Sequence, residues 1–215
     1  MSIKTAILVS TLDCIIFHPL DTIKTRLQTD NFKTMRFKNL YSGIKPSLLN
    51  VVPKITFRLV GFDKLNESIN KPFISGMVLG GFESIFITGP TSFYKNNKQV
   101  MNKSINKKNL YKSIPIVFYK QMLSNSLFFG LYTTFKKDDL THNVMVSGVS
   151  SIISTFVTYP MNTIQTKLQT SDKYTTVKDI CSNGLYKGFT IKLFRATIGK
   201  MFVITLYDVI NELDK

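Results

Sequence analysis

Long apolar stretches, each broken by a few polar or charged positions, follow one another along most of the chain. Residues 3–28, 45–65 and 73–99 are examples, and prolines and charged residues interrupt each of them. A helix that crosses a bilayer needs about 20 mostly apolar residues, and a charged side chain that faces lipid is costly. The pattern therefore predicts an all-α membrane protein whose long helices turn one face to lipid and the other to a water-filled cavity.

Three sets of short sequence markers recur in the same order along the chain. The first set is PLDTIKTRLQ, PTSFYKNNKQ and PMNTIQTKLQ, with spacings of 71 and 70 residues between the prolines. The other two sets are centred on aromatic residues: Tyr41, Tyr111 and Tyr186, then Phe62, Tyr132 and Tyr207. Because a fixed period indicates repeated structural units, we predict one domain of three two-helix repeats, at about residues 1–69, 70–139 and 140–215.

The charge balance narrows the class of protein further. The chain of 215 residues carries 28 Lys and Arg residues against 13 Asp and Glu, a formal net charge of +15, yet 44% of its residues are hydrophobic. A basic nucleic-acid-binding domain is the other class that such a charge suggests. The basic residues are spread along the chain, however, and form no recognised nucleic-acid motif. We therefore expect these charges to face water, a cavity or anionic lipid, and we expect no nucleic-acid polymer as a partner.

The motif Pro-x-Asp-x-x-Lys-x-Arg-x-Gln at residues 19–28, with its two altered copies, resembles the signature of the mitochondrial carrier family. The resemblance covers essentially the whole chain. It implies six transmembrane helices in threefold pseudosymmetry, short matrix helices that link each pair, and a central cavity that opens alternately to either side. It also implies a multi-pass protein of the mitochondrial inner membrane, expected here as a monomer that binds cardiolipin. The short length and the Lys-, Asn- and Ile-rich composition further resemble giant-virus members of the family, which implies a host cell's mitochondrion.

The family resemblance assigns roles to the motif residues. Prolines would kink the odd-numbered helices so that their matrix ends converge; they are Pro19, Pro90 and Pro160. In the family, the acid of each repeat pairs with the base of the next. This implies the contacts Asp21–Lys95, Ser92–Gln165 and Asn162–Lys24, of which only the first is an ion pair. The expected matrix gate consists of these six residues and the glutamines that end the motifs: Gln28, Gln99 and Gln169.

A second gate is expected at the cytoplasmic ends of the even-numbered helices. The family's aromatic-acid-x-x-base motif maps onto Asp63 and Asn66, Thr133 and Lys136, and Asp208 and Asn211. The same cyclic rule leaves Asp63–Lys136 as the one oppositely charged pair. The resemblance therefore implies a cytoplasmic gate that is held by a single ion pair.

Family carriers bind substrate near the middle of the even-numbered helices. One equivalent position in each repeat lies thirteen residues before the acid position of the closing motif, which gives Asn50, Lys120 and Arg195. Gln121 directly follows Lys120, and Ala196 directly follows Arg195. Arg58 lies eight residues after Asn50 on the same helix, about 80° round the helix axis. This set holds several bases and no acid, so we expect it to bind an anion. Other bases lie nearer helix ends and are expected to reach lipid headgroups: Lys45, Lys112 and Lys192.

Two acids complicate the electrostatics of the expected cavity. Asp13 lies six residues before its motif proline and Glu83 lies seven before its own. One residue turns a helix by about 100°, so the two acids need not share a face. A carboxylate at membrane depth needs a partner or a proton. We expect pairing with cavity bases, with proton transport as the alternative.

The sequence leads to one main functional hypothesis and two alternatives. We expect exchange of an anionic solute, with nucleotides or deoxynucleotides as the first class, because Phe57, Tyr119 and Ser124 can meet a sugar or base. A keto acid or other small carboxylate is the second class, since Lys120 and Gln121 form a base-and-amide pair. A non-transporting membrane adaptor is the hypothesis of another class. We expect no enzyme activity, cofactor or metal, because no nucleophile–base pair, phosphate loop or metal-ligand cluster is found.

Overall fold

A computed structural model of the chain describes residues 3–28, 40–99, 107–137, 139–170, 180, 184–186 and 188–213. Within these ranges the regular secondary structure is helical and includes no strand. The predicted all-α class is therefore confirmed. The short matrix helices that the family resemblance implies would fall largely on residues outside these ranges.

Six helical spans follow one another in the described part of the chain. Five are single helices: α1 (Ile3–Gln28), α2 (Ile44–Ile69), α5 (Lys107–Phe135), α6 (Leu140–Thr170) and α8 (Phe189–Leu213). The third span is composite and consists of α3 (Pro72–Glu83), the π-helix η2 (Ser84–Thr88) and α4 (Gly89–Gln99). The repeat boundaries expected after residues 69 and 139 fall in the breaks between α2 and α3 and between α5 and α6. The threefold relation itself stays a prediction.

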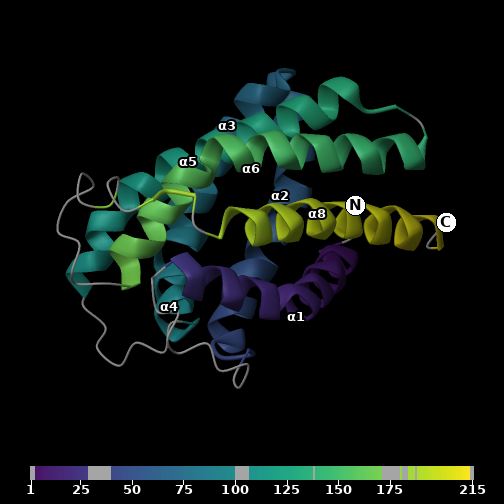
Figure 1. The fold of residues 1–215 in the computed structure, drawn as a ribbon. Helices are drawn as coiled ribbons and strands as arrows, with labels where there is room; N and C mark the ends of the chain where they lie inside the picture. Colours follow the sequence, from purple (N-terminus) through teal and green to yellow (C-terminus); the bar gives the residue numbers. More distant parts are fainter. Residues whose placement is uncertain are drawn as a thin grey trace.

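The spans pack side by side in a closed ring. Each span contacts the next one along the chain, and α8 returns to pack against α1. The two termini lie at the same end of this bundle (Figure 1). In a ring of six helices, the faces that contact neither lipid nor a neighbouring helix point to the centre. The candidate functional site lies there.

The polarity of the bundle is the reverse of that of a water-soluble protein. Large apolar side chains of α1 and α6 are exposed on the outside, among them Leu8, Ile16, Val149 and Phe156. The inward face of α6 is instead a row of small hydroxyl residues, each buried: Ser147, Ser150, Ser151, Ser154, Thr155 and Thr158. Exposed apolar surface of this extent marks contact with lipid or another apolar partner. The helices therefore suit a bilayer outside and a polar interior.

Length and hydropathy alone select only some of the spans as membrane-crossing. Within the described residues, Lys4–Leu27 and Leu140–Thr170 are long and apolar enough. A third candidate is the pair Pro72–Thr88 and Thr91–Gln99, whose axes differ by 61°. These are the odd-numbered spans. The even-numbered helices carry most of the bases of the cavity, which lowers their hydropathy, and their crossing of the membrane stays a prediction from the family resemblance.

Small residues allow α3 and α5 to approach closely. A Cβ atom on Gly76 would lie 2.6 Å from the carbonyl oxygen of Asn125, and one on Gly80 would collide with the backbone of Gln121. The spacing of these glycines is the small-xxx-small pattern of packed membrane helices. Close packing at this point brings the side chains of Glu83 and Gln121 within reach of each other.

The motif prolines lie inside continuous helices in two cases. Pro19 is an interior residue of α1 and Pro160 of α6. The side chain of Pro90, in the composite span, lies outside the described residues. The role of the three prolines as kinks that draw the gate together stays a prediction.

Candidate functional site

A polar cavity of about 510 Å³ lies at the centre of the ring. Five of the six residues expected to bind substrate line it: Asn50, Arg58, Lys120, Arg195 and Ala196. Gln121 does not line this cavity; it lines a smaller side pocket instead. Nine basic residues line the cavity against three acidic ones, so its field favours an anion.

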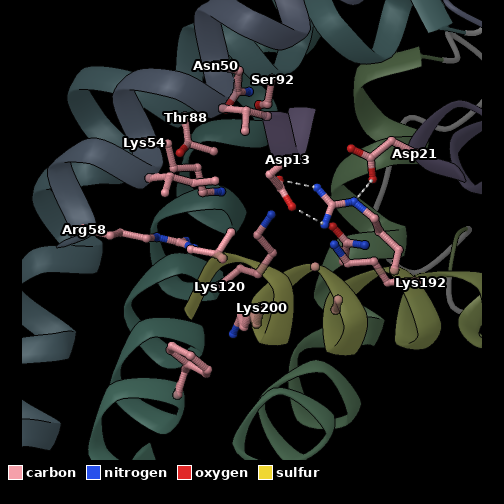
Figure 2. A pocket seen from close by; sticks show the side chains of 18 of the residues that line it. Asp13, Asp21, Asn50, Lys54, Arg58, Thr88, Ser92, Lys120, Lys192 and Lys200 are labelled. Atoms are coloured by element: carbon pink, nitrogen blue, oxygen red, sulfur yellow. Dashed lines mark hydrogen bonds and ion pairs between the residues drawn. The ribbon is translucent and has the colours of Figure 1, made fainter. Parts of the chain in front are cut away.

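Arg58 is engaged by a buried acid. Its Nε donates to Glu83 Oε2 at 2.6 Å and its Nη2 donates to Glu83 Oε1 at 3.1 Å. Lys54 Nζ lies 3.3 Å from the same carboxylate. Figure 2 shows Arg58 and Lys54 on one side of the cavity. A two-pronged arginine–carboxylate contact is strong and directional, so Arg58 is not a free cation in this state.

Glu83 gathers further donors and has no exposed surface. Asn125 Nδ2 donates to it at 2.8 Å, Thr88 Oγ1 at 3.0 Å, and Gln121 Nε2 also donates to it. The carboxylate therefore ties α2, α3, η2 and α5 together. Its accumulated partners satisfy the requirement that a charge buried at membrane depth be paired.

The π-helix η2 explains how Glu83 reaches this position. Glu83 is one residue out of register with Asp13 relative to the motif prolines, and η2 begins at the next residue, Ser84. A π-turn accommodates one extra residue within a helix. It therefore cancels the one-residue offset, and both acids lie inward, with exposed fractions of 2% for Asp13 and 0% for Glu83.

Arg195 is held by two acids of α1. Its Nη2 and Nη1 lie 2.8 Å and 3.3 Å from the carboxylate oxygens of Asp13, and its Nε lies 3.5 Å from Asp21 Oδ1. The guanidinium carbon is also 4.7 Å from the centre of the Phe17 ring. A Cβ on Gly199 would collide with the Arg195 guanidinium, so a glycine is needed one turn further along α8. Arg195 thus links the level of the expected substrate site to the gate residue Asp21.

Two of the three contacts expected at the matrix gate are formed. Lys95 Nζ donates to Asp21 Oδ2 at 2.9 Å, and Gln165 Nε2 donates to Ser92 Oγ at 3.1 Å. The third is absent, because no hydrogen bond joins Asn162 to Lys24 and the buried Nδ2 of Asn162 has no partner among the described residues. Asn162, which was expected to make the third contact of the cyclic set, lines the cavity instead.

The glutamines of the gate form a buried network with the helices they meet. Gln169 accepts from Asn96 Nδ2 at 2.6 Å and donates to Ser92 at 3.2 Å and to Ser113 at 3.1 Å. Gln99 accepts from Thr25 Oγ1 at 2.9 Å. Both glutamines are almost fully buried, whereas the side chain of Gln28 lies outside the described residues. The described part of this end of the cavity is therefore packed by neutral hydrogen bonds around Asp21 and its ion pairs with Lys95 and Arg195.

The opposite end of the cavity is open by comparison. Asp63, Asn66, Thr133 and Lys136 line the cavity there, and the two charged residues are exposed. No ion pair joins Asp63 to Lys136, although both are described. The side chains of Asp208 and Asn211 lie outside the described residues. The described parts of this gate are apart while the matrix-gate residues are in contact.

Sequence reasoning missed several cavity residues. Lys192, expected at the headgroups, lines the cavity, and so does Lys200, which no motif singled out. Lys200 Nζ lies 3.4 Å from the centre of the Phe128 ring, and Phe128 stacks on Tyr132. Conversely, Phe57 and Tyr119, expected to meet a sugar or base, are exposed and line neither pocket. Helical periodicity measured from Lys120 would have found the error for Tyr119, since adjacent residues point about 100° apart.

The described residues include no group of three His, Cys, Asp or Glu side chains that could hold a metal ion. His18 Nε2 lies 3.2 Å from the carbonyl oxygen of Ser42, and its ring stacks on Tyr41. It therefore serves the packing between α1 and the start of α2.

The ring of helical spans, the cationic cavity and the polar residues at its ends agree with the carrier class that the sequence predicts. Comparison with known proteins agrees with this class. Residues 136–214 match the family model described as mitochondrial carrier protein. Curated relatives extend the match to the rest of the chain.

Three of these relatives show the extent of the similarity. The succinate/fumarate mitochondrial transporter of Saccharomyces cerevisiae is 22% identical, over 91% of this chain and 85% of its own length. A mitochondrial carrier-like protein of Acanthamoeba polyphaga mimivirus is 26% identical, over 92% and 90%. The mitochondrial ornithine transporter 1 of Schizosaccharomyces pombe is 21% identical, over 97% and 91%. The resemblance to the mitochondrial carrier family, with a giant-virus carrier-like protein among the relatives, is thus confirmed.

These relatives are named as transporters and carriers, not as enzymes. They include carriers of dicarboxylates and of an amino acid. Similarity at this level therefore supports the carrier class and does not select a substrate. The substrate has to be argued from the cavity.

Proposed function

We propose that the protein exchanges an anionic solute across the mitochondrial inner membrane by alternating access. The proposal rests on one observation, a central cavity of about 510 Å³ with nine basic residues against three acidic ones in its lining. Buried cations without a ligand are costly at membrane depth. A passing anion is the partner that such a lining favours.

Nucleotides or deoxynucleotides are the first substrate class. The cavity volume lies in the range of sites that hold drug-sized organic ligands, and phosphates suit sites that offer several cationic donors. Phe128 and Tyr132, which also line the cavity, take over the part that was expected of Phe57 and Tyr119. A planar base against these rings would gain apolar contact area.

A small carboxylate is the second class, because a succinate/fumarate transporter is among the relatives. The base-and-amide pair that first suggested it is weakened, since Gln121 donates to Glu83 and lies outside the main cavity. A monomer that binds cardiolipin in the inner membrane of a host cell's mitochondria completes the proposal, by resemblance to the family.

The proposed gates work in opposition. The matrix-gate residues would separate, and Asp63 and Lys136 would meet, when the cavity turns to the matrix. Each contact that breaks is a neutral hydrogen bond of about 0.5–1.5 kcal/mol or a charge-assisted one of about 1.5–3 kcal/mol. A gate of this composition is weak enough for a bound anion to open.

Uptake by reconstituted liposomes tests the proposal. The panel would contain ribo- and deoxyribonucleotides, succinate, citrate, a keto acid and, as a cationic control, ornithine. We expect exchange of at least one anion class, stimulated by the same class inside, and none of ornithine. Lys120→Gln should reduce uptake about tenfold or more, whereas Lys112→Gln, an exposed lysine of the same helix, should not. Binding without uptake of any solute would favour the adaptor hypothesis.

A further inference from the structure

A small side pocket of about 120 Å³ opens beside the main cavity, between α2, α5, α6 and α8. Lys120, Lys192, Lys200 and Asn162 line both spaces, so the pocket is a recess of the cavity and is reached from it. No acidic residue lines it. Its volume suits one phosphate-sized group and is too small to hold a nucleoside together with that group.

Among the described residues, five bases line this recess, and they are of two kinds: Lys54 and Arg58 are paired with an acid, whereas Lys120, Lys192 and Lys200 are not. Arg58 and Lys54 share Glu83, while Arg195 and Lys95 share Asp13 and Asp21. Lys120, Lys192 and Lys200, by contrast, have no ion pair with any acid of the described chain. Lys120 donates to Gln165, and Lys200 lies over the Phe128 ring. Figure 2 shows Lys120 and Lys200 near each other beside α8, with Lys192 farther along the same helix.

A second observation points to a missing ligand in the same place. Asn162 Nδ2 is buried and donates to no acceptor among the described residues. A buried donor without a partner is rare and costs free energy. Three ammonium groups without an acid repel one another, and the cost grows as the surroundings become less polar. One bound oxyanion would remove both costs.

The rest of the lining is also made of hydrogen-bonding groups. Thr158 and Ser124 line the recess, although Thr158 Oγ1 already donates to the carbonyl of Ser154 and Ser124 shares a bond with Ser154 Oγ. Because these two hydroxyl groups are already engaged, the lysines and Asn162 are the groups left to donate hydrogen bonds to a ligand in the recess. A tetrahedral group with several oxygens can accept from three ammonium groups and an amide at once. A planar carboxylate has two oxygens and satisfies fewer of them.

We propose that this recess is an off-centre subsite for a phosphoryl group of the transported solute, and that Lys120, Lys192, Lys200 and Asn162 are the lining residues that bind it. The inference rests on the proposed function and sharpens it, because it assigns the solute's phosphate to the three lysines without an acid partner and not to Arg58 and Arg195, whose guanidinium groups are paired with Glu83 and Asp13. Arg58 and Arg195 then position acids and helices, and lysines hold the anion.

Binding of inorganic pyrophosphate to the full chain in detergent tests the subsite. Thermal unfolding is followed with pyrophosphate, and with succinate as the carboxylate probe, at matched ionic strength. We expect Lys192→Gln and Lys200→Gln each to weaken pyrophosphate binding about tenfold, since a hydrogen bond to a charged group is worth roughly that factor or more. Asn162→Ala should weaken it about threefold. Lys112→Gln, exposed on α5, is the matched control and should leave it unchanged.

Melting without any probe separates a binding role from a structural one. Removal of an unpaired ammonium should relieve repulsion, so Lys200→Gln should melt at or above the parent's temperature while losing its pyrophosphate response. Lower melting together with an undiminished response to pyrophosphate would overturn the subsite. An equal loss of response to pyrophosphate and to succinate would overturn the phosphoryl assignment, because it would show a general field effect.

The uptake assay keeps this proposal distinct from the proposed function. Exchange of carboxylates alone, with no pyrophosphate binding, would refute the subsite and leave the anion carrier intact. Pyrophosphate binding that the lysine variants abolish, with no exchange of any solute, would support the subsite and refute the carrier.

Discussion

The two ends of the cavity are built differently. At the matrix gate, Asp21 meets Lys95 and Gln165 meets Ser92, and Gln99 and Gln169 are buried beneath them. At the other end, the charged residues Asp63 and Lys136 are exposed and unpaired with each other. The cyclic pairing rule predicts contacts at both ends of the cavity. In this state they are largely formed at the matrix gate, and the pair Asp63–Lys136 is not formed at the other end.

The difference shows where stability and function separate. Contacts that exist in this state contribute to its free energy of unfolding, so their loss is expected to lower the melting temperature. Under the proposed alternating access, contacts that form only when the cavity faces the matrix contribute nothing to the stability of this state and would act on the transport rate. Substitutions at the two ends should therefore sort by the measurement that they affect.

The largest effect is expected for Asp21→Ala. The change leaves Lys95 without its acid and deprives Arg195 of one of two partners, and removing one member of a buried pair costs about 3–5 kcal/mol. These side chains keep some exposure, so we expect about 2–4 kcal/mol. That corresponds to a melting temperature lower by roughly 4–15 °C for a chain of this size.

Asp63→Ala is the matched variant at the open end. It removes an exposed carboxylate that makes no ion pair with Lys136, and its effect on stability should stay within about 0.5 kcal/mol. Equal melting temperatures for the two variants would contradict the asymmetry of the two ends.

A smaller loss is expected for Gln169→Ala. The truncation leaves Asn96, Ser92 and Ser113 without hydrogen bonds that they now make with the glutamine side chain. A buried group left unpaired costs about 1–3 kcal/mol, so we expect about 2 kcal/mol. Asn66→Ala provides the control. Among the described residues, the Asn66 side chain makes one long hydrogen bond, accepted by its Oδ1 from Ser75 Oγ at 3.4 Å. The measurement is thermal unfolding of both variants in the same detergent.

The residues whose positions could be predicted are those fixed by the repeat. The contacts of Asp21 with Lys95 and of Ser92 with Gln165 follow from the cyclic pairing that the family resemblance implies for three copies of one motif. The inward position of Asn50, Lys120 and Arg195 likewise follows from the family resemblance, which places the substrate site at one equivalent position in each repeat. Helix existence was predictable from hydropathy, whereas the motif copies alone did not reveal that Asn162 misses Lys24.

Other features depend on side-chain packing that one-dimensional patterns do not carry. The pairing of Arg58 with Glu83 requires the π-helix η2, which shifts the register by one residue. Lys192 was assigned to headgroups because it lies near a helix end, three residues after the start of α8 at Phe189, yet it lines the cavity. Lys200 carries no motif, and its direction depends on how α8 packs against the ring.

Asn162→Asp should have a modest effect of opposite sign. It places a carboxylate in a cavity lining that contains Lys24, Lys120 and Lys192, none of which has an acid partner within the described residues. We expect a gain of about 1 kcal/mol, or roughly 2–4 °C in melting temperature, from a charge-assisted contact. Uptake of an anion should slow, because the new carboxylate competes for the lysines. A variant that melts lower and transports at the parent's rate would show that residue 162 does not meet them.

The smallest effect on stability, and the sharpest on transport, is expected from exchanging the charges at the open end. Asp63→Lys alone, or Lys136→Asp alone, should change the free energy of unfolding by no more than about 0.5 kcal/mol, because exposed pairs contribute little. When the cavity turns around, however, each single variant would bring two like charges together. Uptake should then fall about tenfold, which is equivalent to about 1.4 kcal/mol on the barrier. The double variant restores opposite charges and should recover most of the lost rate at an unchanged melting temperature. If the double variant transports no faster than either single variant, the two residues do not meet in any state, and the open end is closed by other groups.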